Sequence, residues 1–241
     1  GENAGRVDDL SSNNNTGIGY NSLYSNTTGY FNTALGPYSL YTNTTGYSNT
    51  ALGYRSLYSN TTGDSNTAVG NNSLYTNTVG YFNTALGNNS LSSNVTGDSN
   101  TAVGYASLYS NTAGYFNTAL GYASLYFNTT GNYNTALGYA SLYSNTIGNY
   151  NTALGYYAGV YQADGSTALT DPENSIYIGY NAKGKDNNDN NSIVIGYNAI
   201  GLGANTVVLG NDSIVTTALK GNVGIGTTSP TQKLDVLGGI R

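Results

Sequence analysis

A 17-residue unit, repeated in register, constrains the fold of this chain more than any other feature. One copy is Gly46–Thr62, GYSNTALGYRSLYSNTT, and copies follow one another from Gly29 to Gly155. An incomplete copy precedes them at residues 15–28. Self-similarity at a fixed period of this length is typical of solenoids, in which each repeat contacts only its neighbours. We therefore expect a stack of coils rather than a fold around one central core.

The copies agree at some positions and differ at others, which indicates the role of each position. The Leu35 position accepts only Leu or Val, whereas the Tyr30 position accepts Tyr, Asp or Asn. Five positions never vary in eight copies, namely those of Asn32, Thr33, Ala34, Gly36 and Asn43. Invariant positions are expected inside the coils or at an interface, and variable positions are expected to face water.

The composition favours short strands over helices. The chain has 33 Gly and 25 Tyr, only 8% of its residues are charged, and it lacks Cys, Met, His and Trp. Gly, Asn and Thr recur every few residues, which opposes helix and favours strands joined by turns. The net charge of −5 gives no electrostatic case for nucleic-acid binding. No apolar run approaches the roughly 18 residues of a membrane span. Disorder is the alternative for such a polar chain, but disordered repeats do not keep Ala, Leu and Gly at fixed positions.

Each unit is interpreted as one coil with two short extended segments, Asn32–Leu35 and Ser39–Asn43, each closed by a turn. Equivalent segments of successive coils would pair in parallel at about 4.8 Å. The fold class is therefore predicted to be all-β, a parallel β-solenoid or β-roll of 17-residue coils. Because side chains alternate along a strand, Thr33 and Leu35 share one face and Ala34 points to the other.

The more apolar face is assigned to the interior. The predicted core comprises Leu35, Leu40, Leu52, Leu57, Leu74, Leu86, Leu108, Leu120, Leu125, Leu137, Leu142, Ile193 and Ile195. The Ala34 position then faces outward, although it never drifts to a polar residue. A small, invariant, outward position is expected where another backbone approaches closely, and the simplest supplier is a second copy of the chain. The predicted subunit interface is Ala34, Ala51, Ala68, Ala85, Ala102, Ala119, Ala136 and Ala153.

The period divides the chain into five parts. These are an N-terminal junction at 1–14, the repeat array at 15–156, a loop excursion at 157–173, a second group of coils at 174–212, and a stalk or trimerisation segment at 213–241. The chain begins at Gly1 without Met, and we expect it to be part of a longer or processed protein. Its last part contains two brief alternating segments and too little apolar area to fold alone.

The second group of coils carries a resemblance. It contains NSIYIGYNA from Asn174, NSIVIGYNA from Asn191 and NTVVLGND from Asn205, and these resemble the heads of trimeric autotransporter adhesins. The resemblance implies a parallel β-roll that assembles as a tight trimer. The tail GNVGIGTTSPTQKLDVLGG is similar to the segment that precedes the intramolecular chaperone domain of phage and viral tail fibres. The 17-residue array matches such fibre proteins only by analogy.

Residue types that carry chemistry are scarce, and we expect no catalytic residue, no metal site and no cofactor. Asp64 and Asp98 occupy equivalent positions two coils apart, roughly 10 Å by coil spacing. That separation alone would suit a glycosidase pair, but both residues have neutral surroundings in the sequence. Residues 186–191, DNNDNN, superficially resemble a calcium loop and lack its central Gly and its terminal Glu. A solvated turn is the preferred interpretation.

The sequence therefore predicts a non-enzymatic, structural subunit of an extracellular, homotrimeric fibre that projects from a cell or virion and takes part in adhesion. Its partners would be itself and a surface glycan or protein receptor, with no nucleic acid and no membrane insertion. The ligand-facing candidates are Tyr30, Tyr47, Tyr81 and Tyr115. One alternative is a receptor-binding phage or viral tail fibre that recognises glycans. An alternative of another class is an ice-binding solenoid. The expectation that Thr33 points into the coil argues against it.

Overall fold

The computed structural model describes residues 13–237, so most of the N-terminal junction expected at 1–14 lies outside the described residues. It contains fourteen strands of three residues each, and no helix occurs in the described part of the chain. No segment of that part therefore forms a helix that could cross a membrane. The chain divides into two units, residues 1–211 and 212–241.

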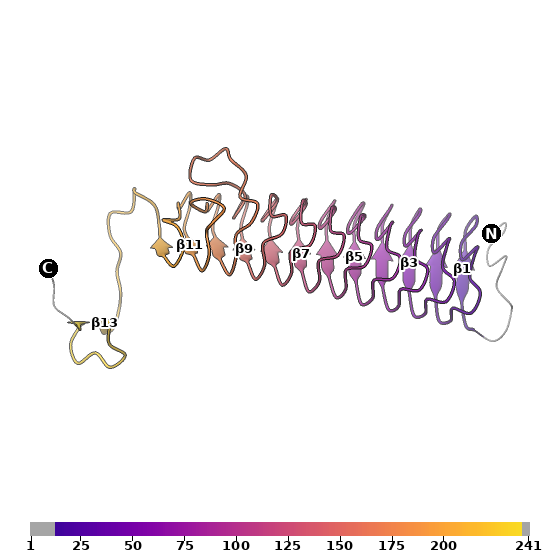
Figure 1. Ribbon diagram of the computed structural model, residues 1–241, viewed down its shortest axis with the longest axis horizontal. Coiled ribbons are helices and arrows are strands. Elements are labelled where there is room, and N and C mark those ends of the chain that lie inside the picture. The colour runs from indigo at the N-terminus through magenta and orange to yellow at the C-terminus, as the bar shows by residue number, and fades with distance from the viewer. Residues whose placement is uncertain (1–12, 238–241) are drawn as a thin grey trace. The chain divides into compact units, whose positions relative to one another are not determined.

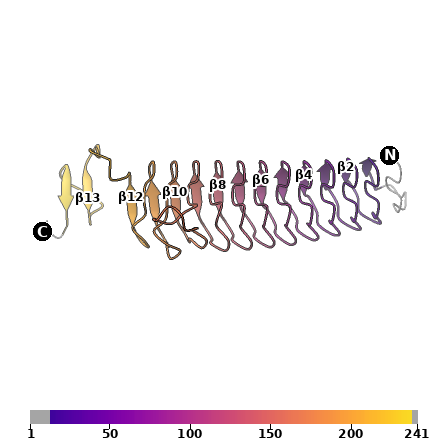
Figure 2. The same cartoon turned by 90° about the horizontal axis from the view of Figure 1, so that it is seen from above.

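The first unit is a β-solenoid whose strands form one twelve-stranded sheet in chain order, β1 to β12, and every neighbouring pair is parallel (Figure 1). The strands are β1 (Thr16–Ile18), β2 (Thr33–Leu35), β3 (Thr50–Leu52), β4 (Thr67–Val69), β5 (Thr84–Leu86), β6 (Thr101–Val103), β7 (Thr118–Leu120), β8 (Thr135–Leu137), β9 (Thr152–Leu154), β10 (Ile176–Ile178), β11 (Ile193–Ile195) and β12 (Val207–Leu209). Each coil contributes one strand, and Figure 2 shows the strands side by side in a row. The predicted parallel β-solenoid is confirmed.

The register follows the repeat. Thr33 pairs with Thr50, Ala34 with Ala51 and Leu35 with Leu52, and the same offset continues to β9. The later coils keep this register although their lengths differ, since Ile176 pairs with Thr152 and Ile193 pairs with Val207. Residues 174–212 therefore continue the sheet of the array rather than starting a new one.

The second extended segment of each coil, expected at Ser39–Asn43, is a succession of turns instead of a strand. Tyr38 and Leu40 adopt left-handed φ angles of 59° and 49°, and their equivalents do the same. A residue with positive φ reverses the local direction of the chain, so this segment cannot extend. Its backbone still bonds along the stack, because the Leu40 N–H donates to Ser56 O at 3.0 Å and the Thr42 N–H to Tyr58 O at 3.0 Å.

Two ladders of buried asparagine side chains hold successive coils together. In the first ladder, Asn83 Nδ2 donates to Asn66 Oδ1 at 3.1 Å and to Gly97 O at 2.8 Å. Asn83 Oδ1 in turn accepts from the backbone N–H and from Nδ2 of Asn100, at 3.0 and 3.1 Å. Each amide thus uses both donors and accepts two bonds, which is the condition for burying such a polar group at low cost.

The second ladder runs through the Asn43 position. Asn77 Nδ2 donates to Asn60 Oδ1 at 2.8 Å and to Gly80 O at 3.0 Å. This bonding also explains the invariant glycine, because a Cβ on Gly80 would lie 2.5 Å from Asn77 Oδ1 and 2.5 Å from Gly97 O. The ladder ends at Asn145, whose buried Oδ1 has no partner.

The second unit contains two strands. Its strands β13 (Val223–Ile225) and β14 (Leu234–Val236) pair in parallel and form a separate two-stranded sheet. Most of its apolar side chains stay exposed, including Val215 at 97% and Leu237 at 74%. Such a small sheet buries little apolar area.

The first ladder generates a stability prediction. Asn83→Ala removes the acceptor of the buried Asn100 N–H and leaves Gly97 O and Asn66 Oδ1 with fewer donors. Each buried polar group left unsatisfied costs about 1–3 kcal/mol, so we expect a loss of about 3 kcal/mol or more in the free energy of unfolding. Hydrogen exchange should show lost protection in the adjacent coils, because each coil contacts only its neighbours.

The exposed Asn88 supplies the matched control, because no hydrogen bond involves its side chain among the described contacts. Asn88→Ala is expected to change the free energy of unfolding by less than about 0.5 kcal/mol. Equal effects from the two substitutions would contradict the structural role assigned to the ladder.

Candidate functional site

The outward face of the twelve-stranded sheet is the first candidate for a functional surface. The residues on it are not the ones that the sequence analysis placed there. The Leu35 position points away from the coil interior, with Leu35 itself 45% exposed and Leu137 37% exposed. Leu52, Leu86, Leu120, Ile193 and Ile195 are half-buried on the same face. These seven were expected in the core, and that assignment was wrong.

The predicted core residues of the Leu40 position are confirmed. Each of them is completely buried within the single chain: Leu40, Leu57, Leu74, Leu108, Leu125 and Leu142. Leu23 and Leu91 complete this column. The interior of each array coil is therefore made by one leucine and one residue from the facing strand.

That facing residue is the alanine that was expected at a subunit interface. Ala34, Ala51, Ala68, Ala85, Ala102, Ala119 and Ala136 are 0% exposed within the single chain, and Ala153 is 1% exposed. An atom already covered by its own coil cannot contact another subunit, so the assignment of these alanines to the interface was wrong. Their invariance has a different cause, because the leucine across the narrow coil leaves room only for a methyl group.

The coils after the array support this volume argument. The leucine column stops at Leu142, and Gly159 stands at the next equivalent position. In the following coils the middle strand residue grows from Ala to Tyr177 and Val194, both 0% exposed. A Cβ on Gly159 would lie 2.8 Å from the Tyr177 ring and 2.9 Å from Leu142 Cδ2. Tyr177 thus occupies the volume that a leucine fills in the array, as close packing requires.

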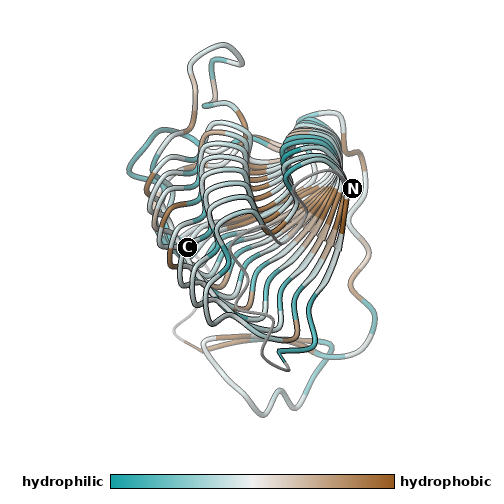
Figure 3. Cartoon of the chain, turned by 90° about the vertical axis from the view of Figure 1, so that its right-hand side faces the viewer, coloured by the Kyte–Doolittle hydropathy of each residue, from teal (hydrophilic) through white to brown (hydrophobic). Residues whose placement is uncertain are grey.

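The outward face carries a column of apolar side chains along its whole length. Every coil from β1 to β12 places Ile, Leu or Val at the Leu35 position, and Figure 3 shows the apolar residues concentrated along the strands. The Thr33 position also becomes apolar in β10, β11 and β12, as Ile176, Ile193 and Val207. Val207 and Leu209 remain 62% and 56% exposed. An exposed apolar patch of this extent is typical of interaction surfaces.

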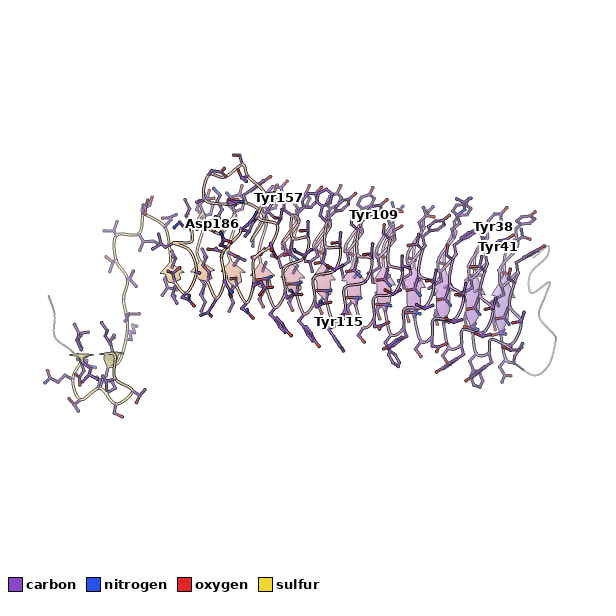
Figure 4. The ribbon with its side chains drawn as sticks, in the orientation of Figure 1. Tyr38, Tyr41, Tyr109, Tyr115, Tyr157 and Asp186 are labelled. Atoms are coloured by element: carbon purple, nitrogen blue, oxygen red, sulfur yellow. The ribbon has the colours of Figure 1, made fainter. Side chains whose placement is uncertain are left out.

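Tyrosine ladders line two other faces of the stack, and Figure 4 shows Tyr38, Tyr41, Tyr109 and Tyr157 along one margin and Tyr115 along the opposite margin. The ligand-facing candidates Tyr30, Tyr47, Tyr81 and Tyr115 are all exposed. Tyr30 and Tyr47 stack with ring centroids 4.9 Å apart, whereas Tyr81 and Tyr115 make edge contacts with Phe82 and Phe116.

The two aspartates at this position have a local role. The Tyr47 N–H donates to Asp64 Oδ1 at 3.0 Å, and the Tyr81 N–H donates to Asp98 Oδ1 at 3.0 Å. The Asp64 carboxylate raises the pKa of Tyr47, and the Asp98 carboxylate does the same to Tyr81. Asn132 accepts the Tyr115 N–H in the same way. Each of these side chains caps a backbone donor of the preceding coil, which explains why Asp and Asn recur at a position otherwise held by Tyr.

The DNNDNN segment folds as a turn. Asp186 Oδ1 accepts the Asn188 N–H at 2.9 Å, whereas Asp189 turns inward and is 0% exposed. Asp189 Oδ2 accepts the Lys185 N–H at 3.0 Å and the Tyr177 hydroxyl at 3.3 Å, and its buried Oδ1 has no partner. Within residues 13–237, no group of three or more His, Cys, Asp or Glu side chains is placed to hold a metal ion. No sequence signal distinguished Asp189 from Asp186 as the buried member of this segment.

Comparison of the chain with models of protein families, with curated proteins and with solved structures found no match. The resemblances of residues 174–212 and of the tail to fibre proteins therefore stay expectations, and any functional assignment depends on the surfaces described above.

The buried Asp189 generates a pH prediction. Burial raises the pKa of its carboxyl group, and the nearby Asp186 adds to this, while the Lys185 N–H and the Tyr177 hydroxyl oppose it. A carboxyl group whose folded pKa exceeds its unfolded value of about 3.9 binds protons more tightly when folded. Its contribution to stability is therefore lost as pH rises from the unfolded pKa through the folded one.

Asp189→Asn removes this titration, so the melting temperature of the variant should rise relative to the wild type between pH 4 and pH 7. Asp212→Asn, which removes one exposed carboxylate, is the control for the change in net charge. A wild type that gains stability over Asp189→Asn as pH rises would contradict the assigned sign.

Proposed function

We propose that this chain is a structural, non-enzymatic subunit of an extracellular homotrimeric fibre, assembled through the outward face of its twelve-stranded sheet. The observation that carries the proposal is the unbroken column of Ile, Leu and Val side chains on that face in every coil from β1 to β12. Exposed apolar side chains arranged as a continuous stripe are stabilised when a partner covers them.

A second copy of the chain fits this stripe better than an unrelated partner. The stripe repeats at the coil spacing of about 4.8 Å, and another copy presents side chains at the same spacing over the same length. Homo-oligomers usually close around a symmetry axis, and a parallel arrangement would bring the identical faces together along the axis of a fibre. The proposal that three subunits assemble depends on the resemblance of residues 174–212 to trimeric adhesin heads.

The second unit provides an independent argument for assembly. Its two-stranded sheet leaves Val215, Leu219 and Leu237 largely exposed. Equivalent segments from neighbouring subunits would cover these side chains, as expected for a stalk. The work of such a fibre is to project, to resist proteolysis and to adhere. The exposed tyrosines at the Tyr30 position are the candidates for contact with a surface glycan, whether the fibre belongs to a cell or to a phage or virus.

The test is the mass in solution together with one pair of matched variants. Light scattering of the wild type should give three times the chain mass of 25.1 kDa. Leu86→Glu combined with Leu120→Glu places two charges on the outward sheet face, two coils apart, and should reduce the mass to that of one chain because burying unpaired charges is costly.

Thr96→Glu combined with Thr130→Glu is the control, since it places the same charges with the same spacing on exposed turns. This variant should keep the wild-type mass. A monomeric wild type, or equal masses for the two double variants, would refute assembly through the sheet face.

Ice binding is retained as a second candidate because one observation now favours it. The Thr33 position was expected to point inward, but Thr16, Thr33 and Thr135 are exposed on the sheet face and the other threonines of this column are half-buried there. A regular threonine column on a flat face is a surface that could order water. Under the fibre proposal, thermal hysteresis should be absent at millimolar protein. Hysteresis that disappears in Thr84→Tyr combined with Thr118→Tyr would instead favour ice binding.

A further inference from the structure

The structure contains a slot between two tyrosine ladders that the fibre proposal does not use. One wall consists of Tyr105, Tyr122 and Tyr139, and the other consists of Tyr126 and Tyr143. Ala123 and Ala140 lie between the walls, and Tyr157 and Tyr161 complete the lining. The slot has a volume of about 400 Å³. We refer to these nine residues as the tyrosine slot.

The slot exists because the side chain at one position of the repeat changes from large to small. The position of Ala123 is occupied by Tyr38, Arg55, Asn72 and Asn89 in earlier coils, by Ala106, Ala123 and Ala140 in three successive coils, and by Tyr157 in the next. The tyrosine walls continue past these alanines, since Tyr105, Tyr122 and Tyr139 stack at 5.1 and 4.9 Å between ring centroids. Part of the space that a larger side chain fills elsewhere forms the slot here, and Ala123 and Ala140 at its floor are 4% and 2% exposed.

The chain itself shows what fits into this space. The Tyr38 ring lies between the two columns and contacts Tyr20 and Tyr54 on one side and Tyr41 and Tyr58 on the other. Its plane is steeply inclined to these rings, at 75° to Tyr20 and 90° to Tyr54. At the far end, the Tyr157 ring stands at 80° to Tyr139 and 69° to Tyr156.

A second planar group occupies the equivalent place one coil after Tyr38. The guanidinium carbon of Arg55 lies 5.0 Å from the ring centre of Tyr54, 5.7 Å from that of Tyr58 and 5.9 Å from that of Tyr38. Wherever this position carries a ring or a guanidinium group, that flat group is held among tyrosine rings.

The electrostatics of the walls favour the face of an aromatic ring. Within each ladder the ring faces are taken up by stacking on the next coil, with interplanar angles of 11° and 4° between the rings of the first wall. The ring edges, which carry partial positive charge, are then left to line the slot. The face of an aromatic ring carries partial negative charge, so a flat ring placed between the walls makes edge-to-face contacts with both. No charged side chain belongs to the slot.

We propose that the tyrosine slot binds a planar aromatic small molecule, which lies along the stack between the two ladders in the place that Tyr38 and Tyr157 fill in other coils. The first wall spans two coil steps, about 10 Å in all, which matches a molecule of two linked or fused rings. The inference goes beyond the fibre proposal and does not depend on it, because the slot is formed within one chain.

The experiment uses thioflavin T, a dye in which a fused benzothiazolium and a phenyl ring are joined by one rotatable bond and whose fluorescence rises when rotation about that bond is restricted. The wild type should bind it saturably, with one site per chain. Ala123→Tyr fills the slot with the residue that the chain carries at positions 38 and 157, and the φ of 51° at Ala123 is close to the 59° and 54° of those tyrosines. This variant should fold normally and lose about tenfold or more in affinity. Ala123→Arg, which places in the slot the side chain that the chain carries at position 55, should have the same effect.

Tyr133→Ser is the matched control on the opposite face. It breaks the stack of Phe116, Tyr133 and Tyr150 at a position where other copies carry serine, and it should leave dye affinity unchanged. Absence of saturable binding in the wild type, equal binding by Ala123→Tyr, or an equal loss in Tyr133→Ser would overturn the proposal. The mass of each variant, measured in the same solutions, separates this result from any failure of assembly.

Competition identifies the class of ligand. Neutral 2-phenylbenzothiazole should displace the dye, which would support recognition of the flat rings rather than of the dye's positive charge. Displacement by neutral oligosaccharides at millimolar concentration, with no displacement by 2-phenylbenzothiazole, would assign the slot to sugars and overturn the aromatic proposal.

Discussion

The buried asparagine ladders are the interaction on which the rest of this structure depends. An amide side chain inside a protein is costly unless its donors and its oxygen all find partners. Here each asparagine of the first ladder finds them on the coil before and the coil after, as Asn83 does with Asn66, Gly97 and Asn100. The requirement fixes the register between coils and the invariance of the asparagines. The second ladder explains the glycine that closes each coil, because a Cβ there would collide with its asparagine side chains. The small hydrophobic interior, one leucine and one alanine per array coil, is positioned by these polar contacts.

Much of this architecture could be predicted from the repeat. The period, the parallel pairing of equivalent positions, the burial of the Leu40 column and the continuation of the register into residues 174–212 all follow from columns that can be read off the chain. The inside–outside assignment of the strand could not be predicted, because alternation states only that Ala34 and Leu35 face opposite ways. Choosing the larger apolar residue for the interior ignored the space already filled by Leu40 across the coil. The change from Ala153 to Tyr177 where the leucine column ends was the available signal. The turns at Tyr38 and Leu40 left no signal, since these residue types seldom adopt positive φ.

The candidate surfaces arise where the chain departs from uniform repetition. The sheet face carries one apolar column in every coil, and the apolar surface widens where Thr gives way to Ile176, Ile193 and Val207. The tyrosine slot arises where three successive coils carry alanine at the position of Tyr38. Its alanines were visible in the sequence, where Ala123 lies between Tyr122 and Tyr126, but only the positive φ of Ala123 shows that the chain turns there and places the two ladders on either side of a slot. The invariant interior therefore acts as a scaffold on which single outward positions can change without disturbing the ladders.

The identity of successive coils has a consequence for how such a chain can change in length. A ladder asparagine always donates to the amide oxygen of the coil before it and accepts from the N–H groups of the coil after it, and every coil of the array offers the same atoms at these places. Duplication or loss of a whole coding unit within the array would lengthen or shorten the rod by one coil, about 4.8 Å, and every amide would meet an equivalent partner across the new junction. Loss of a single codon would shift one rung out of line and leave buried donors unsatisfied on both sides. Variation in reach among related genes is therefore expected in steps of complete coils.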